Sequence, residues 1–308
     1  MVGRTRHQHT VASRAGLSGT GLHSGVKVNL ELLPAPANTG IVFRRTDLDG
    51  FHIEALAKNV ARVSYATSLM KKGVLISTTE HLLSALAGCG VDNAYVDLDN
   101  LELPIMDGSA LPYHRLICAA GIRRQRAWRS YVRILKPVEA VDGAKRIAVY
   151  PAETFRVTYR ISFPHPLIGN QESNYRAEDS SYRTEVAPAR TFGFFEEVEA
   201  LRQNGLVQGG SLENAIVLTR DGLMNPEGLR FPDEFCRHKI LDLIGDLSLL
   251  GHPLIGHMVA ERAGHAMHLA LITRLLRDKS AWELVAAGRL KPSAPANISS
   301  TRQAATAP

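Results

Sequence analysis

The sequence has 308 residues, of which 45% are hydrophobic, and a formal net charge of +6. This composition is typical of a globular protein with two domains, and no apolar run approaches the ~18 residues of a membrane span, so we expect no stable membrane insertion. The polar N-terminus lacks the apolar segment of a secretory signal, and the three cysteines (Cys89, Cys118 and Cys236) form no C-x-x-C pair. These features predict a reducing, cytoplasmic location and argue against a zinc site built from cysteines.

The excess of basic residues is compatible with nucleic acid, an anionic membrane surface or a phosphorylated substrate as partner. Lys and Arg are, however, scattered along the chain, and no arginine-rich helix or aromatic–glycine signature accompanies them. We therefore interpret the charge as a solvated surface and expect no nucleic-acid partner.

The first half of the chain alternates predicted strands and helices. The segments expected to be strands are 26–33, which alternates apolar and polar residues, 41–44 and 93–98. The segments expected to be helices are 80–88, with Thr78 and Thr79 before it as capping residues and glycine at its end, and 111–121. The basic segment 121–130 ends this pattern, so we place a domain boundary after residue 126.

The second half repeats this order. The segments expected to be strands are 131–135, 146–150 and 155–163, followed by a polar loop that runs to residue 181. The segments expected to be helices are 192–203, 234–250 and 267–277, and an extra strand is expected between residues 207 and 218.

Strands followed by helices, occurring twice, predict an α+β fold of two similar two-layer sandwiches. The first domain is expected over residues 1–126. The second is expected over residues 127–280, with a strand–helix–strand insertion around 193–218. Residues 281–308 are expected to form a disordered tail, because from residue 290 onward the sequence is rich in Pro, Ser and Ala and shows no periodicity.

One predicted helix carries an unusual polar stripe. At helical spacing, Glu234, His238, Asp242 and Asp246 lie one turn apart, and apolar side chains surround them. A buried carboxylate is unfavourable unless a hydrogen-bond donor or a cation offsets its charge. His238 and Asp242 have the i, i+4 spacing at which two side chains of one helix can bind the same metal ion. On its own this spacing also fits a structural His–Asp hydrogen bond in the core.

Segments in both halves resemble one family of enzymes. They are 21–25, 34–40, 77–81, 92–96, 104–110, 189–194, 228–231, 233–247 and 263–266. In this order, from about residue 5 to 278, they resemble UDP-3-O-acyl-N-acetylglucosamine deacetylase, the cytoplasmic zinc enzyme of lipid A synthesis in Gram-negative bacteria. The resemblance implies two similar α+β domains with the active site between them.

The resemblance also implies a metal site and its chemistry. His81, His238 and Asp242 match the zinc ligands, and two imidazoles with one carboxylate leave a fourth position for water around a single catalytic ion. Glu80 resembles the family's general base. Alternatively, the negative charge of Glu80 only interacts favourably with the positive N-terminal end of the helix dipole.

Further residues receive roles in the same way. His265 matches the residue that stabilises the oxyanion or protonates the leaving amine, and Asp246 is the candidate counter-charge. Thr191 is a candidate hydroxyl donor to the oxyanion. Lys239 is expected either to face the substrate's polar groups or to be an ordinary exposed lysine.

The implied substrate is UDP-3-O-acyl-N-acetylglucosamine, and a monomer is expected. Phe163 is a candidate for stacking on uracil. The insertion around 193–218 resembles the acyl-chain passage, and its candidate apolar lining is Phe194, Leu206, Val207 and Ile216. Leu22 and Phe192 are further candidates for substrate contact. Glu234 has no role that the resemblance assigns.

Two alternatives remain open at this stage. One is a metal-stabilised binding protein for nucleotides or nucleic acid, which would need neither Glu80 nor His265. The other is a zinc amidohydrolase that acts on a different N-acetylated sugar.

Overall fold

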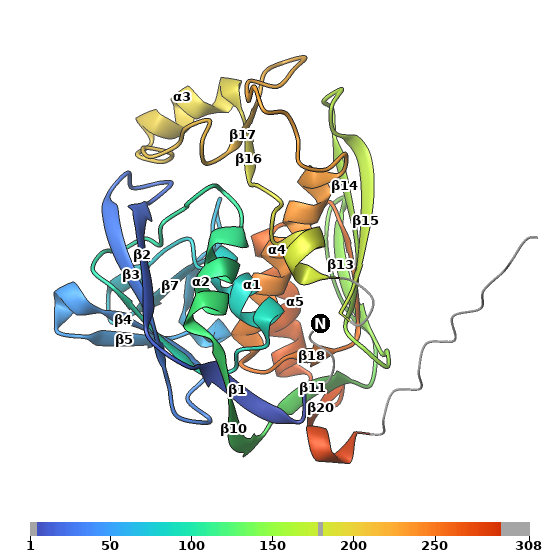
Figure 1. The fold of residues 1–308 in the computed structure, drawn as a ribbon. Coiled ribbons are helices and arrows are strands. Elements are labelled where there is room, and N and C mark those ends of the chain that lie inside the picture. The colour runs from blue at the N-terminus through green and yellow to red at the C-terminus, as the bar shows by residue number, and fades with distance from the viewer. Residues whose placement is uncertain (1–4, 178–180, 291–308) are drawn as a thin grey trace, which may run out of the picture.

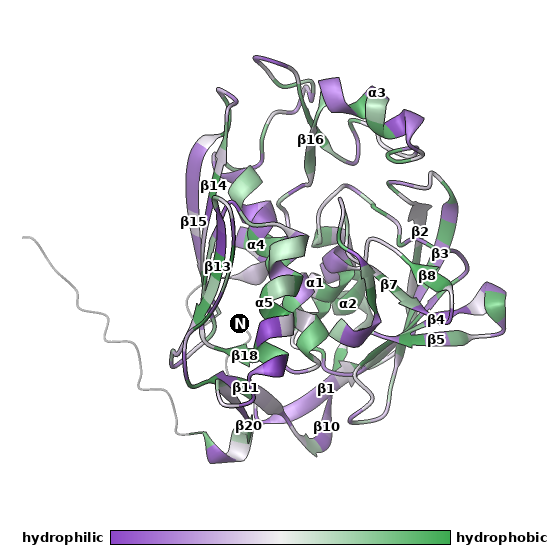
Figure 2. Ribbon diagram, turned by 180° about the vertical axis from the view of Figure 1, so that it is seen from behind, coloured by the Kyte–Doolittle hydropathy of each residue, from purple (hydrophilic) through white to green (hydrophobic). Residues whose placement is uncertain are grey.

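The structure, a computed structural model, describes residues 5–177 and 181–290. Two halves of similar construction face each other, and their helices pack together between the sheets (Figure 1). In the view coloured by hydropathy, the helices at this junction carry mostly hydrophobic residues, while the outer strands contain both hydrophobic and hydrophilic residues (Figure 2). This arrangement is the α+β fold that the sequence predicts.

The N-terminal half is built on a five-stranded sheet of order β2-β3-β9-β4-β5. Its strands are β2 (Ala15–Thr20), β3 (Lys27–Pro34), β4 (Ile41–Arg45), β5 (Phe51–Glu54) and β9 (Ala94–Leu98). A three-stranded sheet consists of β6 (Val60–Arg62), β7 (Ser68–Lys71) and β8 (Val74–Ile76). The helices of this half are α1 (Glu80–Cys89), which precedes β9, and α2 (Leu111–Ala120), which follows it.

The C-terminal half repeats this topology with a sheet of order β12-β13-β19-β14-β15. Its strands are β12 (Val138–Asp142), β13 (Lys145–Tyr150), β14 (Arg156–Phe163), β15 (Gly169–Arg176) and β19 (His257–Glu261). The helices are α4 (Glu234–Leu247), which precedes β19, and α5 (His265–Arg277), which follows it. In each half one central pair is parallel, β4 with β9 and β14 with β19, so the two sheets match strand for strand.

Smaller elements complete the described chain. They are the β1 (His7–Val11) and β10 (Ile122–Trp128) pair, the three-stranded sheet of β18 (Leu254–Ile255), β11 (Ser130–Ile134) and β20 (Trp282–Ala286), the parallel pair β16 (Phe192–Phe194) and β17 (Ile216–Leu218), helix α3 (Phe195–Gln203), and the short helices η1 (Thr46–Leu48), η2 (Ala57–Asn59), η3 (Tyr182–Val186), η4 (Ser248–Leu250) and η5 (Ala287–Arg289). No helix among the residues that the structure describes is long and apolar enough to cross a membrane.

Several sequence-based boundaries differ from the structure. The boundary proposed after residue 126 falls inside β10, whose basic residues pair with β1. The segment expected to be a polar loop contains β15, which pairs with β14 over its whole length and forms an edge of the sheet. The prediction of a disordered tail from residue 281 is wrong for its first residues, because β20 pairs with β11. Residues 291–308 lie outside the described part of the chain.

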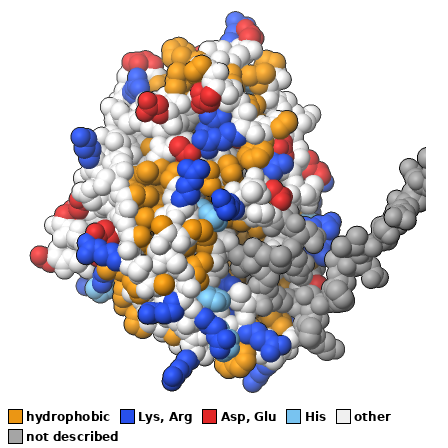
Figure 3. Space-filling view, in the orientation of Figure 1, with side chains coloured by type: hydrophobic (Ala, Val, Ile, Leu, Met, Phe, Trp, Pro, Cys, Tyr) orange, Lys and Arg blue, Asp and Glu red, His pale blue; other side chains and the backbone are white. Residues whose placement is uncertain are grey.

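The insertion is close to its predicted form. The helix expected at 192–203 begins only at Phe195, because Phe192–Phe194 forms β16. With α3 and β17 it makes the strand–helix–strand unit expected around 193–218, and Figure 1 shows this unit standing apart from both sheets. On the face seen in Figure 3, Lys and Arg side chains lie in separate small groups among hydrophobic and acidic ones, as expected for solvated surface charge.

Candidate active site between the two halves

The candidate site lies where α1 of the first half crosses α4 of the second. Both helices are buried, with Leu82 and Leu83 of α1 and Leu241 of α4 fully excluded from solvent. Gly245 allows the close approach: a Cβ added there would lie 2.1 Å from the carbonyl oxygen of Glu80. A side chain at position 245 would therefore push the two halves apart at the point where their polar residues meet.

Three predicted metal ligands meet at this crossing, one from α1 and two from α4. The Nε2 atoms of His81 and His238 lie 3.7 and 3.2 Å from Oδ1 of Asp242. One donor atom from each of the three residues lies within 4.8 Å of the other two, and all three side chains are buried. Within the described residues, Asp242 Oδ1 has no hydrogen-bond partner. An unpartnered buried carboxylate oxygen facing two imidazoles is costly unless a cation binds it.

The protonation states in this cluster suit a metal. Burial lowers the pKa of His81 to about 4 and that of His238 to about 3, so both rings are neutral at pH 7. The Nδ1 of His238 lies 3.1 Å from the carbonyl oxygen of Ala189, which fixes its proton there and leaves Nε2 as a free lone pair. Burial alone would raise the pKa of Asp242, but His238 and Lys239 hold it well below its ordinary value. Two neutral imidazoles and one carboxylate are a ligand set that zinc prefers.

Glu80 lies beside these ligands at the first position of α1. Its carboxylate accepts a hydrogen bond from the backbone N–H of Thr67 at 3.0 Å, and Oε1 lies 3.9 Å from Nε2 of His265. Burial raises the pKa of Glu80 to about 7, partly opposed by the charge of His265. A carboxylate with this pKa can take up and release a proton near neutral pH.

His265 faces the same space from the start of α5. Its Nδ1 lies 2.7 Å from Oδ2 of Asp246, while Nε2 lies 3.9 Å from Oδ2 of Asp242. Burial lowers the pKa of His265, but the charge and hydrogen bond of Asp246 outweigh this effect and raise it to about 9. Asp246 therefore keeps the ring protonated, so that Nε2 carries a proton at neutral pH, while the catalytic role of Asp246 as counter-charge stays a prediction.

Asp246 is itself held by three partners. Its Oδ2 also lies 2.7 Å from Nδ1 of His268, and its Oδ1 accepts a hydrogen bond of 2.6 Å from the hydroxyl of Thr67. Burial would raise its pKa, but the charges and hydrogen bonds of His265 and His268 lower it to about 2. Although Asp246, His265 and His268 also lie close enough to ligate a metal, both histidines already bind the same carboxylate oxygen directly. This cluster is a hydrogen-bonded triad that orients His265.

Lys239 is half-buried and paired rather than an ordinary exposed lysine, and its contact with the substrate's polar groups stays a prediction. Its Nζ donates a hydrogen bond of 2.8 Å to Oδ2 of Asp242 and lies 5.6 Å from the ring centroid of Phe192. The lysine therefore connects the metal-ligand cluster to the first strand of the insertion.

A cluster of aromatic rings continues from Phe192. Phe163 packs edge-on against Phe192 at 5.7 Å between ring centroids, and its ring is tilted by 41° relative to that of Phe194 at 6.0 Å. The backbone N–H of Thr191, just before this strand, donates to the carbonyl of Gly108, which brings a loop of the first half next to the insertion. The structure thus gathers Thr191 and the three phenylalanines at one side of the site, and the stacking of Phe163 on uracil stays a prediction.

Leu22 lies where the insertion touches the first half. The backbone N–H groups of Gln208 and Gly209 donate to the carbonyls of His23 and Leu22 at 3.1 and 3.0 Å. The turn that carries Leu22 is fixed from below by Glu102, a buried residue whose carboxylate accepts hydrogen bonds from the backbone N–H groups of His23 and Ser24. These backbone hydrogen bonds therefore hold the insertion against the turn that carries Leu22 in the first half.

Comparison with known proteins agrees with this geometry. The sequence model of the UDP-3-O-acyl N-acetylglycosamine deacetylase family matches residues 8–277. The chain belongs to this family. Curated proteins named UDP-3-O-acyl-N-acetylglucosamine deacetylase include that of Solibacter usitatus, which is 54% identical over 280 residues, covering 91% of this chain and 95% of the relative. Those of Myxococcus xanthus (92% of this chain, 90% of the relative) and Acidithiobacillus ferrooxidans (90% and 92%) are each 50% identical.

Sequence reasoning missed several residues of this deacetylase-family site. His268 follows His265 at i+3 at the start of α5, and this H-x-x-H spacing was a usable signal for a shared partner. Thr67 gave no signal, because its partners come from three other elements. Glu234, left without a role, forms a buried ion pair with Arg190, whose Nε lies 2.9 Å from its Oε1. That pair anchors the segment leading to Thr191.

Proposed function

We propose that the protein is a zinc-dependent deacetylase that hydrolyses the N-acetyl group of UDP-3-O-acyl-N-acetylglucosamine and releases acetate, the committed step of lipid A biosynthesis. The observation that carries this proposal is that the protonated imidazole of His265 lies 3.9 Å both from the acid–base carboxylate of Glu80 and from Asp242 of the metal-ligand cluster. Family membership over nearly the whole chain supports it. A structural metal site would need neither Glu80 nor His265.

His81, His238 and Asp242 would hold one zinc ion. When bound there, zinc supplies Lewis-acid chemistry: it acidifies a water and polarises the acetamide carbonyl. Glu80 accepts the proton of the attacking water as the water oxygen bonds to the carbonyl carbon. His265, with Nδ1 fixed by Asp246, directs its Nε2–H into the site, where its charge stabilises the oxyanion. Cleavage of the C–N bond then requires a proton on the leaving amine, which His265 Nε2 is placed to donate.

The hydroxyl of Thr191 is proposed as a second donor to the oxyanion. Lys239, which already binds one carboxylate, is proposed to interact with polar groups of the substrate. The acyl chain is proposed to lie against the insertion, between Leu22 and the aromatic side chains of Phe192 and Phe194. Phe163 is proposed to contact the nucleotide part. The expected location is the cytoplasm, and the expected working form is a monomer.

The direct test is to incubate the purified protein with acylated UDP-N-acetylglucosamine and to measure free amine and acetate together. We expect equal amounts of both products, loss of activity with chelator and recovery with Zn²⁺. Hydrolysis of plain N-acetylated sugars at the same kcat/KM would assign the protein to a different amidohydrolase substrate, and the absence of acetate would refute a deacetylase.

The triad around Asp246 gives the first prediction. His265→Ala should retain zinc but lower kcat, and Asp246→Asn should lower it less, because Asn keeps a hydrogen bond to Nδ1 but removes the charge that raises the pKa of His265. If the two residues act as a unit, the double variant should be no slower than the single His265→Ala variant. His52→Gln, at an exposed histidine outside this triad, is the matched control and should leave kcat unchanged. Single effects that simply multiply would refute the coupling.

The insertion gives the second prediction. A buried CH₂ contributes ~0.8 kcal/mol, so losing the contact of about three methylenes should lower kcat/KM roughly 50-fold. Val207→Glu places a charge in the half-buried loop that contacts the Leu22 turn, and it should lower kcat/KM for the acylated substrate by about this factor. Ala200→Glu, with the same charge on the exposed face of α3, is the control and should have little effect.

The comparison with a substrate that lacks the acyl chain completes this test. Plain UDP-N-acetylglucosamine should be turned over poorly by the wild type and by Val207→Glu alike. Equal handling of both substrates by the wild type would place the acyl chain elsewhere.

A further inference from the structure

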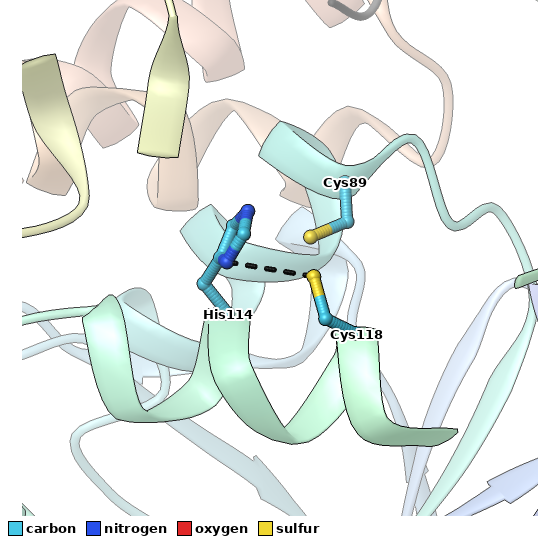
Figure 4. Close-up of side chains that lie close together, drawn as sticks. All are labelled: Cys89, His114 and Cys118. Atoms are coloured by element: carbon cyan, nitrogen blue, oxygen red, sulfur yellow. Dashed lines mark hydrogen bonds between the residues drawn. The ribbon is translucent and has the colours of Figure 1, made fainter. Parts of the chain in front are cut away.

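A second cluster of metal-ligating side chains lies at the other end of α1. Cys89, the last residue of α1, faces Cys118 and His114, which are one turn apart on α2 (Figure 4). Their sulfur and nitrogen atoms all lie within 4.8 Å of one another. His81 and Cys89 are eight residues apart on the same helix, so the two clusters are separated by about 12 Å along its axis. None of these three residues takes part in the site described above.

The distance between two of the donor atoms matches what a tetrahedral ion requires. The Sγ of Cys118 lies 3.6 Å from Nδ1 of His114. With bond lengths of about 2.3 Å to sulfur and about 2.0 to 2.1 Å to nitrogen, two ligands at a tetrahedral angle lie about 3.6 Å apart. Figure 4 shows both sulfur atoms and the imidazole directed into the space between α1 and α2.

The surroundings fix the imidazole and keep it neutral. The ring of His114 stacks on Tyr182 at 6.3 Å between centroids, and Tyr182 is in turn held by a hydrogen bond from its hydroxyl to Ser84. Burial lowers the pKa of His114, and the charge of Arg183 lowers it further. A neutral ring whose Nδ1 faces two sulfurs is already in the form that a metal needs.

The two thiols differ in their accessibility to solvent. Cys118 is exposed and Cys89 is half-buried, so a cation can enter from the α2 side. Burial raises the pKa of the Cys89 thiol to about 12, so a cation must displace its proton. Two thiolates with a divalent ion form a neutral complex, which the nearby arginine does not repel.

We propose that Cys89, His114 and Cys118 form a second metal site that binds a thiophilic divalent cation such as Zn²⁺ and clips the C-terminal end of α1 to α2. Three protein ligands leave the fourth position to solvent, on the exposed side of Cys118. The sequence spacing argued against cysteine-bound zinc because Cys89 and Cys118 are far apart along the chain, and only the packing of α1 on α2 joins them. The proposal does not depend on the proposed catalytic function.

Cobalt substitution separates this site from the catalytic one. Thiolate ligands give Co²⁺ a charge-transfer band in the near ultraviolet, whereas a site of two histidines and one aspartate cannot. We would strip the full-length protein of metal under reducing, oxygen-free conditions and titrate it with CoCl₂ while recording this band. The expected result is two ions per chain, with the thiolate band growing in proportion to one of them.

Variants then assign the band to its ligands. Cys118→Ser and Cys89→Ser should each bind one ion and show no thiolate band, and His114→Ala should weaken the second ion at least tenfold. Cys236→Ala, which removes the remaining cysteine from a buried position, is the matched control and should keep the band. His238→Ala should lose the catalytic ion and keep the band, so failure of this site and failure of the catalytic site are distinguishable.

Thermal stability gives an independent test of whether a metal ion links α1 to α2. Excess Zn²⁺ should raise the melting temperature of the wild type more than that of Cys118→Ser, because only the wild type has the second site to fill. A reduced wild type that binds one ion without a thiolate band would overturn the proposal. A thiolate band that survives in both serine variants would also overturn the proposal. The same holds if a Cys89–Cys118 disulfide forms in air but the reduced protein binds no metal ion at these residues.

Discussion

His238→Ala is expected to abolish zinc binding at the catalytic centre and, with it, detectable deacetylation. The neutral Nε2 of His238 lies 3.2 Å from Asp242 Oδ1, and its other nitrogen is held by the Ala189 carbonyl, so the ring is fixed with its free lone pair toward Asp242. The same outcome is expected for His81→Ala and Asp242→Ala, because each removes one of the three proposed protein ligands.

The measurement is zinc content and kcat on the same preparation. It is best made in a Cys118→Ser background, so that an ion at the proposed second site does not mask the loss of the catalytic one. His52→Ala is the matched control, since this exposed histidine lies outside both clusters. Full zinc content and full activity in all three ligand variants would refute the site.

The stripe on α4 shows how much of the site a sequence can reveal. Helical spacing alone put His238, Asp242 and Asp246 on one face, and the apolar residues around them predicted burial, which the structure confirms. The pairing of this stripe with Glu80 and His81 came from resemblance, because nothing local in α4 points to α1. The contact depends on Gly245, whose missing side chain matters only once the two helices are in place.

Much of the fold was also predictable from local sequence patterns, and the errors again arose where long-range contacts decide the structure. Strands with alternating or apolar sequences, such as β3 and β14, were found at nearly their observed bounds. The polar β15 and the basic β10 were taken for a loop and a boundary, since their strand form comes from pairing with β14 and β1 rather than from their own composition. Long-range pairing of this kind overrides local preference.

Glu80→Gln is expected to lower kcat by roughly 10² to 10⁴ while leaving the zinc and the fold in place. Gln has the same shape as Glu and can still accept the hydrogen bond from the Thr67 backbone, but it cannot accept a proton from water. The buried carboxylate is not a predicted ligand, so zinc content should stay at the wild-type level.

The pH dependence of kcat gives the sharper test of this role. The base works only when deprotonated, and burial raises the pKa of Glu80 to about 7, so the wild-type rate should rise with pH through the neutral range. It should fall again above about pH 9, where His265, whose pKa Asp246 raises to about 9, loses the proton that it donates. In Glu80→Gln this acidic limb should disappear from the residual activity. Zinc content and melting temperature serve as controls for the intact site. Wild-type turnover, or an unchanged acidic limb at reduced turnover, would show that another group takes the proton.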